Sequence, residues 1–189
     1  MHFNSNHALL QHLHLQLREL QSLRNNLGNL APAFLTLKPS ADSWSANECL
    51  KHLNNYGDFY LPQLIKSIEQ LPKEASANSA PFRSGWLGNK FINMMQIKSN
   101  GKPKKIMKSP ADKLPINNLE IEKTMKNFDE QLLKLDQILQ KSSGKNLENI
   151  RIPISLSRFI QLKVGDVLQF YMAHHLRHLH QAKRAAEVK

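Results

Sequence analysis

Four long segments of this chain repeat their apolar residues at steps of three and four, the spacing of one face of an α-helix. They cover about residues 4–27, 45–69, 117–140 and 164–187. Gly28 is well placed to end the first of them. No strand pairs and no internal repeat are evident. The four stripes therefore predict an all-α fold, a four-helix bundle that forms one domain over residues 1–189.

The start of the second segment carries a local helix signal. Ser45 is followed three residues later by Glu48, which matches a capping box, and Trp44 and Cys49 have the spacing of a hydrophobic staple. Asparagines at 117–118 are candidate N-caps for the third segment. We therefore expect the second helix to begin at Ser45.

Residues 72–117 differ from the rest, because five prolines interrupt any long helix and Ser, Asn, Gly and Lys are frequent. An apolar stretch at 86–95 predicts a short helix lying over the bundle. The connection is too long for a tight turn between helices. We expect a partly structured crossover between the second and third helices, or a lid over a site.

Composition favours a soluble, cytoplasmic protein. Hydrophobic residues make up 41% of the chain, and no apolar run approaches the roughly 20 residues needed to cross a bilayer. The first six residues lack the layout of a secretion signal. The single cysteine rules out an intramolecular disulfide framework and fits a reducing compartment. We expect no membrane partner.

The formal charge of +11 raises the question of nucleic acid. The densest basic run, residues 98–108, has no aromatic residue between its lysines on which a base could stack. Most other lysines are spread over expected surface positions. We interpret the charge as a solvated basic surface and do not expect nucleic-acid binding to be the main role.

Histidines gather in the fourth segment, where four of the eleven residues at 171–181 are histidine. On a helix His174, His178 and Gln181 fall within about 60° of one another, and two imidazoles one turn apart can aim at one metal ion. His175 lies inside the same apolar arc. Geometry alone therefore leaves two ligand pairs open, His174 with His178 and His175 with His178, and only slightly favours the first.

His52 faces inward on the second helix, one turn after Glu48. A lone histidine on an apolar face is more often a hydrogen-bonded core residue than a ligand. Arg177 and His180 fall on the polar side of the fourth helix, and we expect His180 to be exposed. We also expect exposed positions for the histidines of the first segment, His7, His12 and His14.

Two stretches resemble the DinB/YfiT-like superfamily, whose members are metal-dependent enzymes on a four-helix bundle. Residues 44–53 read WSANECLKHL, and residues 164–181 read VGDVLQFYMAHHLRHLHQ. The family pattern is a histidine on helix two and His-x-x-x-His-x-x-Gln on helix four. The stretch GKPK at 101–104 is similar to the long connection of some members. The resemblance implies a divalent-metal triad made of His52, His174 and His178.

The resemblance implies less about the reaction. Some members transfer a low-molecular-weight thiol to electrophiles, others are called hydrolases, and many have no assigned activity. Three neutral imidazoles leave open positions on a divalent ion, with zinc or nickel expected and iron also compatible. We expect a small-molecule substrate. Related bundles are often dimeric, so a homodimer is a further expectation.

No general base is obvious near the predicted triad. Glu48 already has a capping role, Gln181 would orient a ligand or a bound water, and Tyr56 lies one turn after His52. Cys49 is expected to be a buried, inert thiol rather than a ligand or nucleophile. We therefore name no catalytic residue from the sequence.

Three functions follow as hypotheses. The first is a metal-dependent thiol transferase or hydrolase acting on a small molecule. The second is a non-catalytic bundle that binds a ligand or partner, with a structural or vacant metal site. The third, suggested by charge alone, is DNA binding, which would weaken as salt rises.

Overall fold

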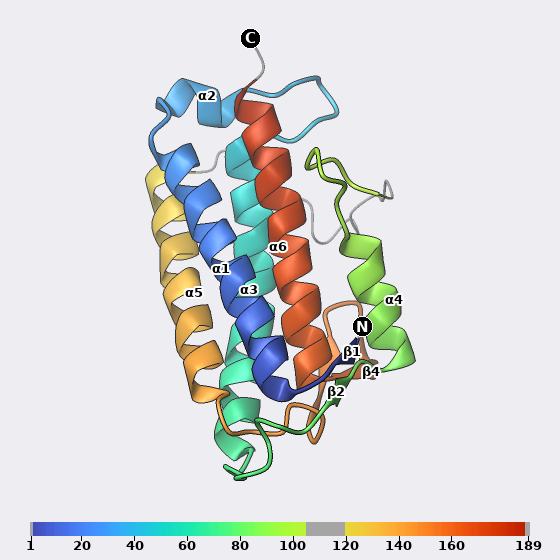
Figure 1. Ribbon diagram of the computed structural model, residues 1–189. Coiled ribbons are helices and arrows are strands. Elements are labelled where there is room, and N and C mark those ends of the chain that lie inside the picture. Colours follow the sequence, from blue (N-terminus) through green and yellow to red (C-terminus); the bar gives the residue numbers. More distant parts are fainter. Residues whose placement is uncertain (1, 105–119, 188–189) are drawn as a thin grey trace.

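Four long helices run side by side and form the bundle (Figure 1). They are α1 (Asn6–Gly28), α3 (Ala46–Gln70), α5 (Ile121–Lys141) and α6 (Val164–Ala186). The coordinates are a computed structural model that describes residues 2–104 and 120–187. Helix α3 packs against both α5 and α6, and α1 packs against α6. The predicted all-α bundle is confirmed.

A predicted sequence signal explains where α3 begins. Ser45 Oγ accepts the Glu48 N–H at 3.2 Å while Glu48 Oε2 accepts the Ser45 N–H at 2.8 Å, so the capping box is present. The predicted start of the third helix at 117–118 lies outside the described residues, and α5 is described from Ile121. Helix α6 begins at Val164, as predicted.

Leucines form the core stripe of α1. Those of the predicted stripe are nearly inaccessible to solvent, and Leu10 is buried beside them: Leu9, Leu13, Leu17, Leu20, Leu23 and Leu27. Because burying each such side chain contributes about 1.5–3 kcal/mol, this stripe alone is a large part of the driving force for assembling the bundle.

Polar contacts set how α3 and α5 meet. Gln131 Nε2 donates to the Asn54 carbonyl at 3.0 Å and to Asp58 Oδ1 at 2.9 Å. Asn54 Nδ2 in turn donates to the Thr124 carbonyl at 2.9 Å. Gly57 makes room for the Gln131 amide, because a Cβ at this position would collide with it. These bonds fix the helix that carries His52.

The crossover after α3 is partly structured, as expected. Its short helix α4 (Trp86–Met95) matches the predicted apolar stretch and packs along α6. The buried carboxylate of Asp166, near the start of α6, accepts the N–H of Gly85 at 3.0 Å. Gly88 allows this approach, because a Cβ there would overlap the carboxylate. The start of α4 is thereby tied to the start of α6.

The prediction that the chain forms no strand pairs is wrong. Strands β3 (Arg151–Ile154) and β4 (Ser157–Lys163) form an antiparallel hairpin with Arg151 opposite Lys163. A second, minimal pair joins β1 (His2–Phe3) to β2 (Phe82–Arg83). The sequence at 151–155 is short and extended, as β3 is, but Pro153 hid its pairing with β4, since Pro removes a backbone donor and is unfavourable in most strands. Buried Ile152 and Ile154 hold this strand against the bundle.

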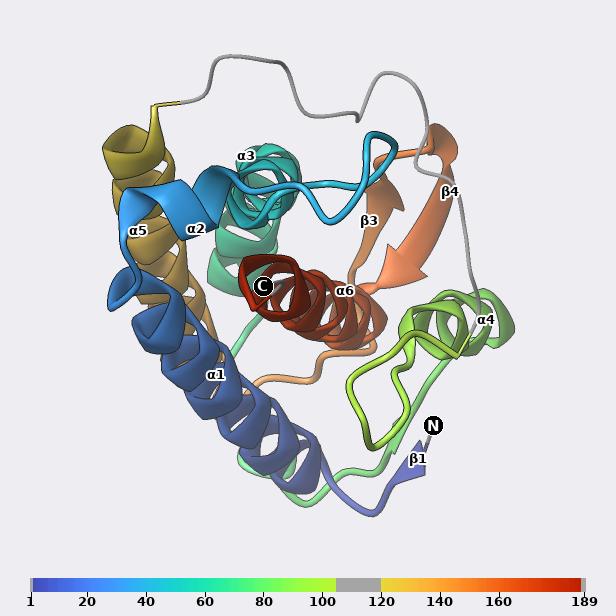
Figure 2. The same ribbon diagram turned by 90° about the horizontal axis from the view of Figure 1, so that it is seen from above.

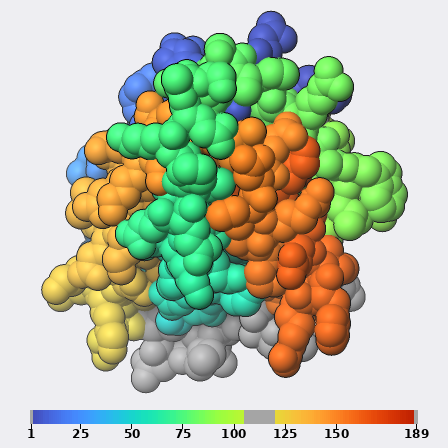
Figure 3. Space-filling view, turned by 90° about the horizontal axis from the view of Figure 1, so that it is seen from below, coloured from blue at the N-terminus to red at the C-terminus, as the bar shows by residue number. Residues whose placement is uncertain are grey.

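Seen along the bundle, α4 and the β3–β4 hairpin lie on one side of α6, and α1 and α5 lie on the other (Figure 2). A further helix, α2 (Pro32–Thr36), crosses the end near the C-terminus of α6. Figure 3 shows the opposite end, where the orange residues of the hairpin lie beside the green end of α3. Within the described residues, every helix is too short or too polar to span a membrane.

Candidate metal site

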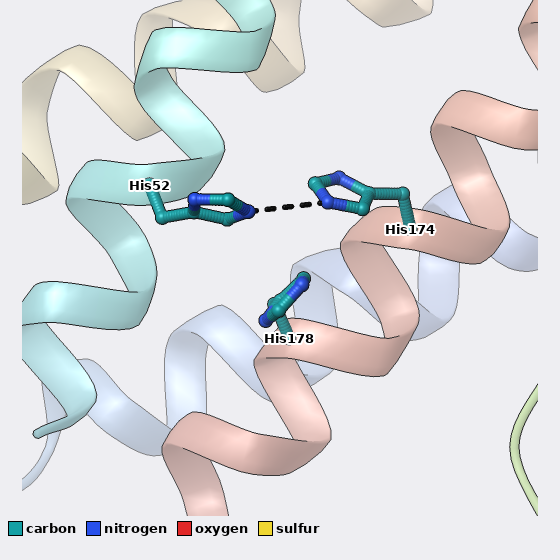
Figure 4. A group of neighbouring side chains, drawn as sticks. All are labelled: His52, His174 and His178. Carbon is teal, nitrogen blue, oxygen red and sulfur yellow. Dashed lines mark hydrogen bonds between the residues drawn. The ribbon is translucent and has the colours of Figure 1, made fainter. Parts of the chain in front are cut away.

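Three histidines from two helices converge inside the bundle. His52 comes from α3, and His174 and His178 lie one turn apart on α6 (Figure 4). The Nε2 atoms of His52 and His174 are 3.2 Å apart. One candidate ligand atom from each of the three rings lies within 4.8 Å of the other two. The fold thus joins residues that are 122 positions apart in the chain.

This spacing suits a metal ion. Two imidazole nitrogens at about 2.0–2.1 Å from a tetrahedral zinc ion would be about 3.3 Å apart, close to the separation of the His52 and His174 nitrogens. The three side chains are also nearly inaccessible, at 1%, 3% and 8% exposure. The donor set therefore fits a divalent ion that prefers imidazole ligands.

Burial keeps the rings on α6 neutral. Desolvation holds the pKa of His174 and of His178 well below the ordinary value, and nearby Arg177 and the neighbouring histidines lower both further, because protonation would bring positive charges together. A metal ligand must be neutral imidazole with a free lone pair. At neutral pH both rings have the protonation state that metal binding requires.

Gln181 fixes the orientation and tautomer of His178. Its Oε1 lies 3.0 Å from His178 Nδ1, and because an amide oxygen only accepts, Nδ1 carries the proton. The lone pair of His178 is then on Nε2. Hydrogen bonding of the second ring nitrogen is the usual way in which proteins orient a histidine ligand.

A comparison with protein families identifies the family of this chain. A model of the DinB superfamily matches residues 12–182, which include all three histidines. The chain belongs to the DinB superfamily. Comparison with curated proteins and with solved structures found no significant match.

Aromatic side chains enclose the histidines of this DinB protein. The ring of Trp44 lies 4.8 Å from that of His52 and 5.8 Å from that of His178, measured between centroids. Tyr56 packs on the other side, 4.1 Å from His174 and 4.9 Å from His52. These rings limit the access of water to the cluster.

The cluster that could hold a metal ion contains His174 and not His175. His175 turns away from the cluster, and its Nδ1 donates to the Tyr171 carbonyl at 2.8 Å. Its ring stacks on Tyr171 at 3.8 Å and lies 6.0 Å from Phe128. Burial lowers its pKa to about 3. His175 is a buried, neutral core residue: its ring lies 5.8 Å from that of His174 but packs on Tyr171 and lies outside the cluster.

Cys49 and Glu48 do not join the cluster. Cys49 is fully buried, and burial strongly raises the pKa of its thiol, as expected for an inert cysteine. Glu48 is occupied by the capping box and by Lys38, whose Nζ lies 2.7 Å from Oε1. Hydrogen bonds from Lys38 and from the Ser45 N–H outweigh desolvation and lower the pKa of Glu48.

Four further histidines lie outside the cluster, with a mixed outcome for their predicted exposure. His7 is exposed, as expected, whereas His12 and His14 are half-buried on α1. The prediction that His180 is exposed is wrong, because its Nε2 lies 3.0 Å from Glu19 Oε1 and the ring is half-buried. None of the four reaches the site.

The three histidines form part of the wall of a cavity of about 130 Å³. Helices α3, α4 and α6 and the β3–β4 hairpin supply the rest of the wall. Tyr60 holds the hairpin in place, because its hydroxyl accepts the Ser155 N–H at 3.0 Å. The cavity therefore reaches all three histidines of the cluster.

Arg177 is a cavity residue whose position the sequence analysis predicted wrongly. It was placed on the polar side of the fourth helix, yet it is only 8% exposed and lines the cavity. The reason is α4, which covers that side of α6, and Arg177 Nη1 donates to the Met94 carbonyl of α4 at 3.1 Å. The predicted helix at 86–95 was the available signal, since an apolar helix lying over the bundle must bury part of another helix.

Proposed function

We propose that this DinB protein binds one divalent metal ion through His52, His174 and His178 and uses it to transfer a low-molecular-weight thiol to, or to hydrolyse, a small molecule. The observation that carries the proposal is the convergence of three buried imidazoles on the wall of a cavity. Zinc or nickel is the expected ion, and iron also suits imidazole ligands.

A divalent ion on three imidazoles lowers the pKa of a bound thiol or water and keeps coordination positions open. The chain itself would supply orientation and enclosure. Gln181 holds His178 with its Nε2 lone pair available. Trp44 and Tyr56 shield the rings from water. The cavity would seat the substrate, with α4 as a lid, in a protein that we place in the cytoplasm.

Metal analysis tests the first half of this proposal. The chain, made without a histidine tag, should contain about one equivalent of divalent metal, and His174→Ala and His178→Ala should each lose it. His7→Ala is the matched control, because His7 is exposed on α1 and should leave the metal content unchanged. Absence of stoichiometric metal from the wild type, or its retention in both cluster variants, would contradict the proposal.

Turnover tests the second half. The zinc-loaded and nickel-loaded proteins should couple cysteine to an aryl chloride, with the sulfur–carbon bond forming, chloride leaving and the thiol proton passing to solvent, or should cleave a nitrophenyl ester. His178→Ala should abolish the activity.

A non-catalytic binding role is the second candidate. One observation favours it: among the described residues that line the cavity, none is a carboxylate that could serve as a general base. In this case the metal would be structural. Stoichiometric metal without turnover of any thiol or ester tested would support this reading over the enzymatic one.

A further inference from the structure

Two hydroxyl groups lie next to each other in the wall of the histidine cavity. Tyr60 of α3 and Ser155, in the turn between β3 and β4, both line it. The Ser155 N–H donates to the Tyr60 hydroxyl at 3.0 Å, and this hydroxyl donates back to Ser155 Oγ at 3.4 Å. The first bond has an ordinary length, whereas the second is longer than the roughly 2.5–3.0 Å of most O–H···O bonds. The pair is therefore held firmly at its backbone end and loosely at its hydroxyl end.

The hydrogen bonds of this pair leave one donor over. Burial raises the pKa of Tyr60, so the phenol is protonated at neutral pH and has a proton to donate. Among the described residues, Ser155 Oγ is the acceptor that this proton finds, and the proton of the Ser155 hydroxyl finds none. A hydroxyl that accepts a hydrogen bond becomes a better donor of the next one in the chain. The Ser155 hydroxyl is therefore prepared to donate to an acceptor in the cavity.

The wall around the two hydroxyls is apolar. Ile154 of the hairpin and Phe91 of α4 line the cavity with them. Phe170 of α6 connects the two ends of the cavity, because its ring lies 6.0 Å from that of Tyr60 and 5.7 Å from that of His174, measured between centroids. A ligand that packs on Phe170 therefore has the hydroxyl pair near one end and the histidine cluster near the other.

The volume limits the size of such a ligand. The cavity measures about 130 Å³. An engineered cavity of about 150 Å³ in another protein holds benzene. A body of about one ring therefore fits. An oxygen atom carried on this body loses its bound water on entering, which costs free energy unless a donor in the wall replaces the lost hydrogen bond. A neutral hydroxyl donor suits a neutral acceptor such as a carbonyl oxygen.

We propose that the cavity selects small carbonyl compounds with an apolar body of about one ring, and that the Ser155 hydroxyl, oriented and polarised by Tyr60, donates to the carbonyl oxygen. The body packs on Phe170. This inference deepens the proposed function and rests on it for the other end of the ligand, which faces the three histidines. Ser155 is then a specificity-determining residue, and Tyr60 is a positioning residue.

Acetophenone and α-methylstyrene test the proposal, because they share one shape and differ in a carbonyl oxygen against a CH₂ group. Their dissociation constants are measured by NMR titration of the metal-free full chain at pH 7.5, so that no bound ion attracts the oxygen. Ser155→Ala should weaken acetophenone binding about threefold to tenfold and leave that of α-methylstyrene within twofold. An equal loss for both probes, a smaller loss for acetophenone, or no binding of acetophenone to the wild type would overturn the inference.

The carbonyl stretching band gives a readout that a merely structural role would not move. Bound, isotope-labelled acetophenone should absorb at a lower frequency than in an apolar solvent, because a hydrogen bond weakens the C=O bond. Ser155→Ala should abolish this shift, and Tyr60→Phe should reduce it, since the serine hydroxyl then lacks its polarising partner. A shift that survives unchanged in Ser155→Ala would refute the role of this hydroxyl.

Ser157→Ala is the matched control. Ser157 lies on the same hairpin, its Oγ accepts the Phe159 N–H at 3.3 Å, and it is not part of the cavity wall. Both affinities and the carbonyl band should equal those of the wild type, and a loss as large as that of Ser155→Ala would show that the hairpin as a whole, and not one hydroxyl, sets the preference.

Folding and metal binding are controlled separately. If Tyr60→Phe does not fold, Ser155→Ala decides, because it keeps the N–H that bonds to Tyr60. Zinc affinity measured on the same samples separates this inference from the proposed function. Zinc binding without an effect of Ser155→Ala on acetophenone refutes the carbonyl site alone. A clear effect of Ser155→Ala in a protein that binds no zinc refutes the metal site alone.

Discussion

Replacing Gln181 by leucine should weaken metal binding without removing a ligand. In the metal-free protein His178 can move its proton to Nε2 once the Gln181 oxygen is gone. A metal ion on Nε2 forces the proton back to Nδ1, where a buried N–H would have no acceptor at 3.0 Å. An unsatisfied buried donor costs about 1–3 kcal/mol, or roughly fivefold to 150-fold in affinity.

Competition with a chromogenic chelator at pH 7.5 would measure the zinc affinity of each variant. We expect Gln181→Leu to lose about tenfold to a hundredfold, the usual range for such supporting residues. Gln181→Glu should bind at least as tightly as the wild type, because its carboxylate accepts the same proton. Gln63→Leu is the control, since Gln63 bonds to the Phe59 carbonyl away from the cluster. A Gln181→Leu affinity within twofold of the wild type would refute this reasoning.

Three stability predictions concern the metal-free protein and are measured by urea unfolding. The pKa of His175 falls from 6.5 to about 3 on folding, so the unfolded chain takes up a proton at a higher pH than the folded chain. The free energy of unfolding therefore decreases as pH drops from about 6.5 toward 3, by up to about 1.4 kcal/mol per pH unit. His175→Phe should flatten this dependence, and an unchanged slope would contradict it. Ser45→Ala removes the hydroxyl that accepts the Glu48 N–H in the capping box and should lower the free energy of unfolding by about 1 kcal/mol. No measurable decrease would disprove the role of the cap. Tyr60→Phe removes the hydroxyl that accepts the Ser155 N–H and should lower the free energy of unfolding by about 1 kcal/mol. Hydrogen exchange at the Ser155 amide should become faster, and an unchanged exchange rate would show that the bond is not made.

The long helices could be predicted because their signals are local. The leucine stripe of α1 and the Ser45 capping box are set by residues a few positions apart, and the structure confirms both. The pair formed by His174 and His178 follows from helical spacing in the same way. Choosing His174 over His175 needed the family pattern, because the two rings differ on the helical wheel only in which neighbouring helix each one faces.

Features that depend on contacts between distant segments could not be predicted. Arg177 and Asp166 look like surface residues on the wheel of one helix, but α4 covers that face and buries both. The β3–β4 hairpin was missed for a related reason. β3 is short and contains a proline, so its pairing with β4 depends on packing against α3 and α6 rather than on a local pattern.

The most direct test of the three-histidine site is a crystal structure of zinc-loaded, tag-free protein with anomalous scattering recorded on both sides of the zinc edge. We predict one anomalous peak per chain, with His52, His174 and His178 each contributing one nitrogen at about 2.0–2.1 Å. A peak held by other residues, or imidazole rings packed together with no ion between them, would contradict the account.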